Sequence, residues 1–215
     1  MDLITLTDPR SPVSEAYRTL RTNLSFYSVD DPIHSLVITS SASDDDKSIV
    51  AANLAVTMAQ SGRNTILVDC DLRRPSLNSL FDLNAEPGLT NVILGEYDGI
   101  PLQQTGVENL SLLASGPKPP NPADMLGSKR VDTLIAELTG QADLVIFDSP
   151  PALAVTDAAV QGAKVDGVLL VIGAGKTRRE HAERAKESLE KARVRIVGST
   201  LTNAPHDSMV GDYYG

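Results

Sequence analysis

Short apolar runs alternate with amphipathic stretches along most of the chain. Apolar runs of about five residues between polar turns are typical of buried parallel strands, and apolar positions three or four residues apart are typical of covering helices. The alternation predicts an α/β fold, a mostly parallel twisted sheet with helices on both faces. We expect strands at residues 34–39, 65–69, 102–105, 110–114, 143–147, 167–172 and 195–202.

Helices are predicted between these runs from apolar spacing and from residues that favour helix ends. The helix at 14–27 has Ser14 in a position to cap its first turn. The helix at 47–61 has one apolar face and ends before Gly62, a residue that favours helix termination. The remaining expected helices are 76–81, 89–94, a stretch beginning at Asn121-Pro122, and 177–192.

Length and charge restrict the possible classes of protein. The 215 residues suit one domain, expected at 1–202, followed by a flexible polar tail at 203–215. The net charge of −9 argues against a nucleic-acid-binding face and against direct adhesion to anionic lipid. The single cysteine, the absence of a signal-peptide pattern and the lack of an apolar run of about 20 residues fit a cytoplasmic protein.

A polar turn connects the first predicted strand to the helix at 47–61. Its sequence, Ser41-Ala42-Ser43-Asp44-Asp45-Asp46-Lys47-Ser48, resembles a phosphate-binding loop, G-x-x-x-x-G-K-[ST]. In such a loop the lysine reaches the β- and γ-phosphates and the hydroxyl binds Mg²⁺. Lys47 and Ser48 fit this pattern, whereas Ser41 and Asp46 replace its glycines. The turn alone is compatible with a phosphate loop or with an ordinary polar turn before a helix.

Carboxylates follow two of the predicted strands. Asp69 and Asp71 lie two residues apart, where alternation would direct both side chains to one side, and Asp148 follows a later strand. Ligands of open α/β sheets bind at the carboxyl ends of strands, and paired carboxylates can hold Mg²⁺. The alternatives are a solvated strand end paired with Arg73 and Arg74, and a simple cap before the proline turn for Asp148.

The lysine turn and the two acidic strand ends, in this order, resemble the cytoplasmic domain of bacterial tyrosine kinases, a family that accompanies capsular and exopolysaccharide synthesis. The resemblance covers nearly the whole chain. The matching parts are the E-x-x-R-x-x-R segment at 11–21, nucleotide motifs at 66–75 and 144–151, a P-P-N-P segment at 116–126, Asp157, Asn203 as the residue beside adenine, and the tyrosine pair Tyr213 and Tyr214.

This resemblance implies a deviant P-loop NTPase fold that uses ATP and Mg²⁺ to phosphorylate tyrosines on neighbouring subunits of a homo-oligomeric ring. It implies that Asp69 deprotonates or orients the tyrosine hydroxyl. It also implies activation by a membrane polysaccharide co-polymerase, reversal by a tyrosine phosphatase, and recruitment to the inner face of the cell membrane. The implied sites are catalytic Lys47, Asp69, Asp71 and Asp148, a nucleotide site at 41–49 with Asn203, metal ligands Ser48, Asp71 and Asp148, acceptors Tyr213 and Tyr214, and subunit contacts Glu15, Arg18 and Arg21.

Three acidic residues distinguish this loop from the glycine-rich loop of the family. Asp44, Asp45 and Asp46 fill it, and Ile49 replaces a usual hydroxyl residue. A carboxylate ~6 Å from a phosphate charge is repelled by about 3 kcal/mol at an effective dielectric of ~20. Three such carboxylates would reduce ATP affinity strongly unless they turn outward or bind another cation. Two alternatives to an active kinase therefore remain: a pseudokinase that works by binding, and a partitioning-type ATPase.

Overall fold

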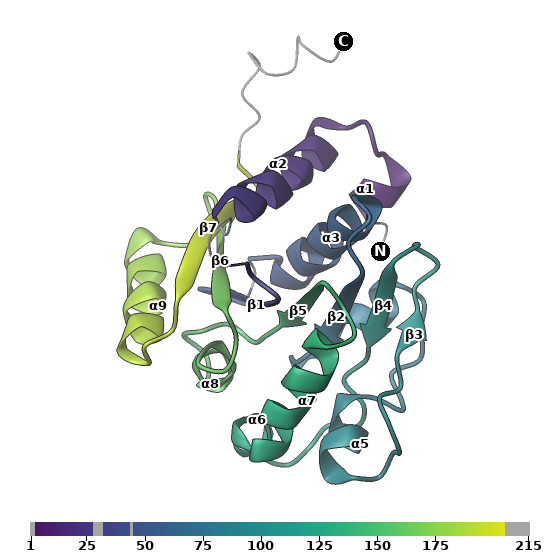
Figure 1. Ribbon diagram of the computed structural model, residues 1–215. Coiled ribbons are helices and arrows are strands. Elements are labelled where there is room, and N and C mark those ends of the chain that lie inside the picture. The colour runs from purple at the N-terminus through teal and green to yellow at the C-terminus, as the bar shows by residue number, and fades with distance from the viewer. Residues whose placement is uncertain (1–2, 28–31, 44, 205–215) are drawn as a thin grey trace.

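The computed structural model describes residues 3–27, 32–43 and 45–204. Within these residues a seven-stranded sheet has the order β3-β4-β2-β5-β1-β6-β7, with helices on both of its faces (Figure 1). All neighbouring strands are parallel except the pair β3 and β4. The strands are β1 (Ser35–Ser40), β2 (Thr65–Asp69), β3 (Gln103–Gln104), β4 (Leu110–Leu113), β5 (Leu144–Asp148), β6 (Gly167–Gly173) and β7 (Ile196–Thr202).

The predicted α/β fold with a mostly parallel sheet is confirmed. Each predicted strand lies within one residue of the observed one at both ends. Side chains alternate between the two faces, so that Leu36 and Ile38 join the apolar core on one face and Val37 joins the core on the other. Because both faces are covered, the strands read as continuous apolar runs rather than as alternating ones.

The helices follow the predicted order with several differences. The stretch predicted from Pro122 divides into two helices at Ser128, and α1 and α8 were not predicted. The helices are α1 (Ile4–Thr7), α2 (Pro12–Tyr27), α3 (Lys47–Gln60), α4 (Leu77–Leu80), α5 (Leu89–Leu94), α6 (Pro122–Gly127), α7 (Lys129–Thr139), α8 (Asp157–Gly162) and α9 (Arg179–Lys191).

The predicted cap at Ser14 is wrong, because α2 begins earlier and Ser14 is buried inside its first turn. The Ser14 hydroxyl donates to the carbonyl oxygens of Ile4 (3.1 Å) and Asp8 (2.8 Å). It therefore connects α2 to α1. The short helix α1 is held in turn by Thr5, whose amide and hydroxyl both donate to Oδ1 of Asn53 on α3.

The middle of the sheet places three strand ends side by side. Strand β5 pairs with β2 on one side and with β1 on the other, and Asp69 lies opposite Asp148 in the register. Strand β1 leads through residues 41–46 into α3, which packs on the face shared by β1, β2 and β5. The polar side chains that follow these strands are thereby brought to one edge of the sheet.

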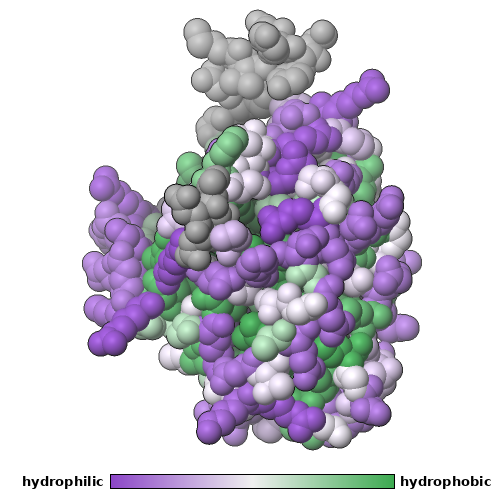
Figure 2. Space-filling view, in the orientation of Figure 1, coloured by the Kyte–Doolittle hydropathy of each residue, from purple (hydrophilic) through white to green (hydrophobic). Residues whose placement is uncertain are grey.

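The surface seen in Figure 2 is largely hydrophilic, with apolar side chains showing between the charged ones. Large apolar side chains are exposed on α2, where Val13, Phe26 and Tyr27 are at least half exposed, and on β7 at Leu201. None of the helices described in the structure is long and apolar enough to cross a lipid bilayer.

Candidate functional site

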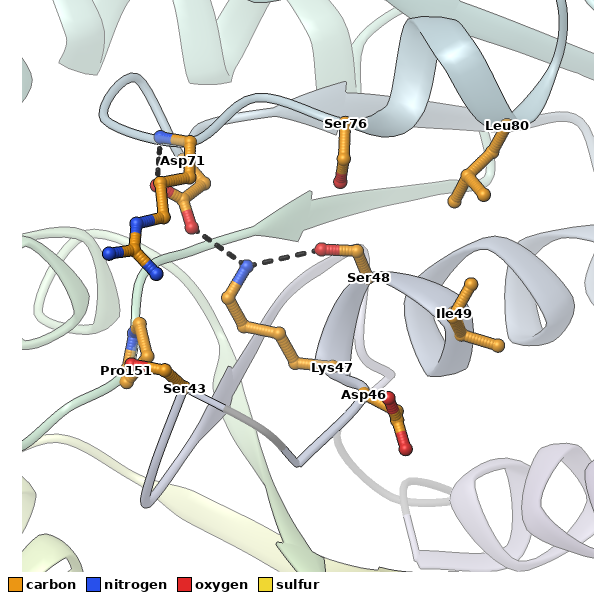
Figure 3. Close-up of a pocket in the computed structure, with 10 residues that line it drawn as sticks. Ser43, Asp46, Lys47, Ser48, Ile49, Asp71, Ser76, Leu80 and Pro151 are labelled. Atoms are coloured by element: carbon orange, nitrogen blue, oxygen red, sulfur yellow. Dashed lines mark hydrogen bonds and ion pairs between the residues drawn. The ribbon is translucent and has the colours of Figure 1, made fainter. Parts of the chain in front are cut away.

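A pocket of about 260 Å³ lies at this edge of the sheet, between the first turn of α3 and the segments that follow β2 and β5 (Figure 3). The loop before α3 forms one wall, and the segment from Asp71 to Leu80 forms the opposite wall. The lining residues are Ser43, Asp46, Lys47, Ser48, Ile49, Asp71, Arg74, Ser76, Leu80 and Pro151.

Lys47 extends from the first turn of α3 into a group of buried oxygen atoms. Its Nζ lies 2.9 Å from Oδ2 of Asp71, 3.1 Å from Oδ1 of Asp148 and 3.2 Å from Oγ of Ser48. The Ser48 hydroxyl also donates to Oδ2 of Asp148 at 2.5 Å. Burial lowers the pKa of Lys47, but the negative charges of Asp148 and Asp71 outweigh burial and raise this pKa above its ordinary value. The ammonium group therefore stays charged between two carboxylates.

Asp148 has no exposed surface, and its surroundings act on its pKa in opposite directions. Burial raises the pKa of Asp148, whereas the charge of Lys47 and the hydrogen bonds from Ser48 and Lys47 lower it, and the net direction is upward. The simple strand-end cap considered for Asp148 is wrong. Its carboxylate instead connects β5 to the side chains of Lys47 and Ser48 in the first turn of α3.

Asp69 lies beside Asp148 but has different partners from Asp71. Its Oδ2 accepts hydrogen bonds from the amides of Ser76 and Leu77, both at 2.9 Å, at the start of α4. Its Oδ1 has no hydrogen-bond partner among the described residues. Burial and the charge of Asp148 raise the pKa of Asp69 to about 7, against these two hydrogen bonds and the charge of Lys47. Asp69 is fully buried and does not line the pocket.

The alternative of a solvated strand end paired with two arginines is wrong, because Asp69 and Asp71 are buried and Arg73 pairs with another residue. The guanidinium of Arg73 forms two 3.0 Å bonds to the carboxylate of Asp157, which is buried at the start of α8. Arg74 lines the pocket, and its backbone amide donates to Oδ1 of Asp71 at 3.0 Å. The pair of Arg73 and Asp157 thus fixes the turn that carries Asp71.

The acidic residues of the loop do not all face the pocket, contrary to the expectation of three carboxylates near a phosphate. Asp45 is 1% exposed and is not a lining residue. Asp46 lies at the pocket edge in a left-handed conformation (φ 57°). Its carboxylate accepts a 3.0 Å hydrogen bond from Asn203 and turns away from the ammonium of Lys47 (Figure 3). Asp44 lies outside the described residues.

The first turn of α3 is suited to bind an anion. The backbone amides of Lys47, Ser48 and Ile49 have no hydrogen-bond acceptor among the described residues, and Asp46 does not cap them with its side chain. Free amides at a helix N-terminus, together with the helix dipole, favour phosphate groups. The sequence-predicted residues Ser43, Asp46, Lys47, Ser48, Ile49 and Asp71 meet at this pocket.

The oxygen atoms around Lys47 are of the kind that binds Mg²⁺. Ser48, Asp71 and Asp148 supply hydroxyl and carboxylate oxygens, and Mg²⁺ binds through one or two carboxylates together with phosphate oxygens and water. Among the described residues no group of three or more acidic, histidine or cysteine side chains forms a separate metal cage. Phosphate oxygens and water would complete the ligands of a cation bound by these residues.

The residues predicted to contact another subunit have partners within the chain. Arg18 pairs with Glu15 and donates to the carbonyl of Pro9 at 2.7 Å. Arg21 donates to the carbonyl of Thr57, at the far end of α3, at 3.0 Å. None of Glu15, Arg18 and Arg21 lines the pocket. The predicted acceptors Tyr213 and Tyr214 lie outside the described residues.

Sequence reasoning missed two residues that shape the loop, Gly173 and Thr177. Gly173 ends β6, and Thr177 lies in the turn before α9, which begins at Arg179 rather than at the predicted position 177. Both donate hydrogen bonds to Asp45. No local pattern could identify them, because their partner lies on a distant part of the chain.

Comparisons with known proteins find a matching family model and similar chains. A family model of the ParA type, described as an NUBPL iron-transfer P-loop NTPase, matches residues 33–203. The tyrosine-protein kinase YwqD of Bacillus subtilis is 44% identical over 201 residues, which cover 93% of this chain and 85% of YwqD.

Two solved structures have TM-scores of 0.91 with this chain. One is the chimerical protein CapA2B2, which is 35% identical, with 95% of this chain and 90% of that one covered. The other is the kinase domain of the Escherichia coli tyrosine kinase ETK, which is 32% identical, with 97% of this chain and 82% of that one covered.

Proposed function

Because the chain belongs to the bacterial tyrosine kinases, we propose that it transfers the γ-phosphate of ATP to Tyr213 and Tyr214 of its C-terminal tail. The observation that supports this function is the position of Lys47. Its ammonium lies between Asp71 and Asp148, beside the amides of residues 47–49, which have no acceptor among the described residues. The same pocket therefore offers amides for phosphate and oxygen atoms for a cation.

The nucleotide would bind with its phosphates against the first turn of α3. The amides of residues 47–49 would donate to phosphate oxygens, and Ser41, Ala42 and Ser43 would form the beginning of the loop around them. Asn203, which lies beside Asp46 at the end of β7, would contact the adenine. Lys47 would leave the two carboxylates and contact the β- and γ-phosphates, since its charge is then balanced by phosphate.

Ser48, Asp71 and Asp148 would hold Mg²⁺ once Lys47 has moved. Mg²⁺ supplies positive charge that neutralises the β- and γ-phosphates during transfer. In the structure the Lys47 ammonium provides positive charge at this place, because it forms ion pairs with the buried carboxylates of Asp71 and Asp148.

Asp69 would accept the proton of the tyrosine hydroxyl. A pKa of about 7 suits a group that takes up a proton near neutral pH, and one oxygen of Asp69 has no partner among the described residues. Its burial requires that the segment containing Ser76 and Leu77 moves when the tyrosine enters, because Asp69 holds both of their amides.

Phosphorylation in trans within a homo-oligomeric ring is part of the same proposal. Helix α2 would contribute to the subunit contact through Glu15, Arg18 and Arg21, together with its exposed Val13 and Phe26. The resemblance to the family supports a role in capsular or exopolysaccharide synthesis and export. It also supports activation by a membrane polysaccharide co-polymerase at the inner face of the membrane, and reversal by a tyrosine phosphatase.

The second candidate is a pseudokinase that binds nucleotide poorly. Asp46 favours it, because this residue lines the pocket and its carboxylate would repel phosphate, although Nζ of Lys176 lies 3.7 Å from that carboxylate and offsets part of its charge. Asp45 does not add to this argument, since its carboxylate is buried away from the pocket. The names of the relatives favour a kinase over the partitioning-type ATPase.

The test uses two variants of the full chain that complement each other. Lys47→Ala removes the phosphate contact but keeps the tyrosines, and the double variant Tyr213→Phe, Tyr214→Phe keeps the pocket but removes the acceptors. Each is incubated with ATP and Mg²⁺, alone and mixed, and phosphotyrosine is detected by mass spectrometry. We expect phosphate on the Lys47→Ala chain only in the mixture. No phosphotyrosine in the wild type, together with no heat of ADP·Mg²⁺ binding, would establish the pseudokinase instead.

A further inference from the structure

The carboxylate of Asp45 accepts four hydrogen bonds from two separate parts of the chain. Oδ2 accepts from the hydroxyl of Ser41 and from the amide of Ala42, both at 2.8 Å. Oδ1 accepts from the amide of Gly173 at 3.0 Å and from the hydroxyl of Thr177. The first pair belongs to the start of the loop, and the second pair belongs to the end of β6 and the turn that follows it.

Gly173 is needed for this contact because there is no room for a side chain. A Cβ atom built on Gly173 would lie 2.7 Å from Oδ1 of Asp45, closer than real Cβ contacts. The backbone carbonyl of Asp45 is also held, by the hydroxyl of Thr202 at 3.2 Å. Asp45 is therefore fixed by both its side chain and its backbone to the ends of β6 and β7.

The energetics of this arrangement differ from those of an exposed acidic residue. A buried charge is costly unless hydrogen bonds replace its hydration, and hydrogen bonds to a charged acceptor are stronger than neutral ones. Four donors satisfy both oxygens of Asp45. Any shift of the loop that separates Asp45 from its donors would leave a buried charge unsatisfied, so the network strongly favours one loop conformation.

We propose that Asp45 is a positioning residue that holds the phosphate loop against β6 and the turn before α9. Through this contact it keeps the start of α3, which follows directly, and the amides of residues 47–49 in the position that binds phosphate. The negative charge at Asp45 thus favours nucleotide binding, whereas the charge at Asp46, which lines the pocket, opposes it. This inference rests on the nucleotide site proposed above and assigns opposite effects to two adjacent aspartates.

The experiment compares Asp45→Asn with Asp46→Asn in the full chain, with ADP·Mg²⁺ affinity measured by calorimetry. We expect Asp45→Asn to raise Kd at least about tenfold, because Asn cannot accept at both positions. We expect Asp46→Asn to lower Kd severalfold. Added salt should reduce the effect of Asp46→Asn, because salt screens the repulsion between Asp46 and phosphate. It should leave the effect of Asp45→Asn nearly unchanged. Equal tightening of binding by both variants would overturn the proposal.

Two further substitutions test the same contact from its other side. Thr177→Val removes one donor with little change of shape, and Thr177→Ser keeps the hydroxyl. We expect weaker ADP binding in the first and nearly wild-type binding in the second. Gly173→Ala should also weaken binding, because its methyl group displaces the Asp45 carboxylate. Wild-type affinity in both Thr177→Val and Gly173→Ala would contradict a positioning role.

Hydrogen exchange without nucleotide separates this inference from the proposed function. Asp45→Asn should speed exchange of the Ala42 and Gly173 amides, whereas Asp46→Asn should not. Unfolding by urea shows whether each variant is folded. If the wild type binds no ADP·Mg²⁺, the proposed function fails. Unchanged exchange of both amides in Asp45→Asn overturns the inference about Asp45, whether or not nucleotide binds.

Discussion

The ammonium of Lys47 donates to both carboxylate oxygens of Asp148, at 3.1 and 3.3 Å, and Asp148 has no exposed surface at all. One residue lies in the first turn of α3, and the other ends β5. Their contact joins the loop side of the pocket to the middle of the sheet. It also balances a carboxylate that the interior would otherwise not tolerate as a charged group.

Lys47→Met should destabilise the fold as well as abolish nucleotide binding. Removing the ammonium leaves Asp71 and Asp148 buried without a counter-charge, and loss of one partner of a buried ion pair costs about 3–5 kcal/mol. Urea unfolding measures the loss. The double variant Lys47→Met, Asp148→Asn should recover part of it, since it removes one of the stranded charges.

The matched control is Lys186→Met, because Lys186 forms an exposed pair with Glu190 at 3.5 Å. Its effect on the free energy of unfolding should stay within about 0.5 kcal/mol. Similar losses for the two lysine variants would show that the buried cluster has no special role in stability.

Asp69 should give the protein a measurable dependence of stability on pH. Its pKa is raised from 3.8 to about 7, so the folded state holds this proton more tightly than the unfolded chain does. The resulting stabilisation is complete below about pH 4 and is lost as pH rises through about 7. Between these limits the wild type should lose up to about 4 kcal/mol relative to Asp69→Asn in urea unfolding without metal.

Asp98→Asn serves as the comparison for Asp69→Asn, because it makes the same substitution at an exposed position. It should follow the wild-type dependence of stability on pH throughout. Parallel curves for the wild type and Asp69→Asn would contradict the raised pKa.

Arg73→Ala should destabilise the turn that carries Asp71. It leaves the buried carboxylate of Asp157 without its two hydrogen bonds, and we expect a loss of about 2 kcal/mol, moderated by the exposure of the arginine side chain. Arg73→Lys keeps the charge but not the two hydrogen bonds of the guanidinium. Its stability should therefore lie between that of the wild type and that of Arg73→Ala. Arg179→Ala, which breaks an exposed pair with Glu183, is the control and should have almost no effect on urea unfolding.

Arg21→Ala should reduce stability by about 1 kcal/mol, because its hydrogen bond to Thr57 joins α2 to the end of α3. The exposed neighbour Asn23 provides the control Asn23→Ala, with no expected change. Light scattering of the same samples reports assembly. A loss of assembly with unchanged stability would show that Arg21 acts between subunits and that its bond within the chain is unimportant.

The sequence was sufficient to predict the strands, helix α3 and the proximity of three residues of the site. Continuous apolar runs identified the buried strands because both faces of the sheet are covered. Lys47, Asp71 and Asp148 were placed together because parallel strands end at one edge of a sheet. The alternation rule did not extend from Asp69 to Asp71, since β2 ends at Asp69 and the chain then turns.

The sequence by itself therefore determined the fold class and the kind of residue that meets at the pocket, since these follow from short-range periodicity. Only the tertiary structure decided which acidic side chains face that pocket. Asp45 and Asp46 are adjacent, yet one is buried against Gly173 and the other lies at the pocket edge. The physical reason is that a carboxylate in a turn points toward the hydrogen-bond donors within its reach. The donors of Asp45 include groups from a strand and a turn that are distant in the sequence.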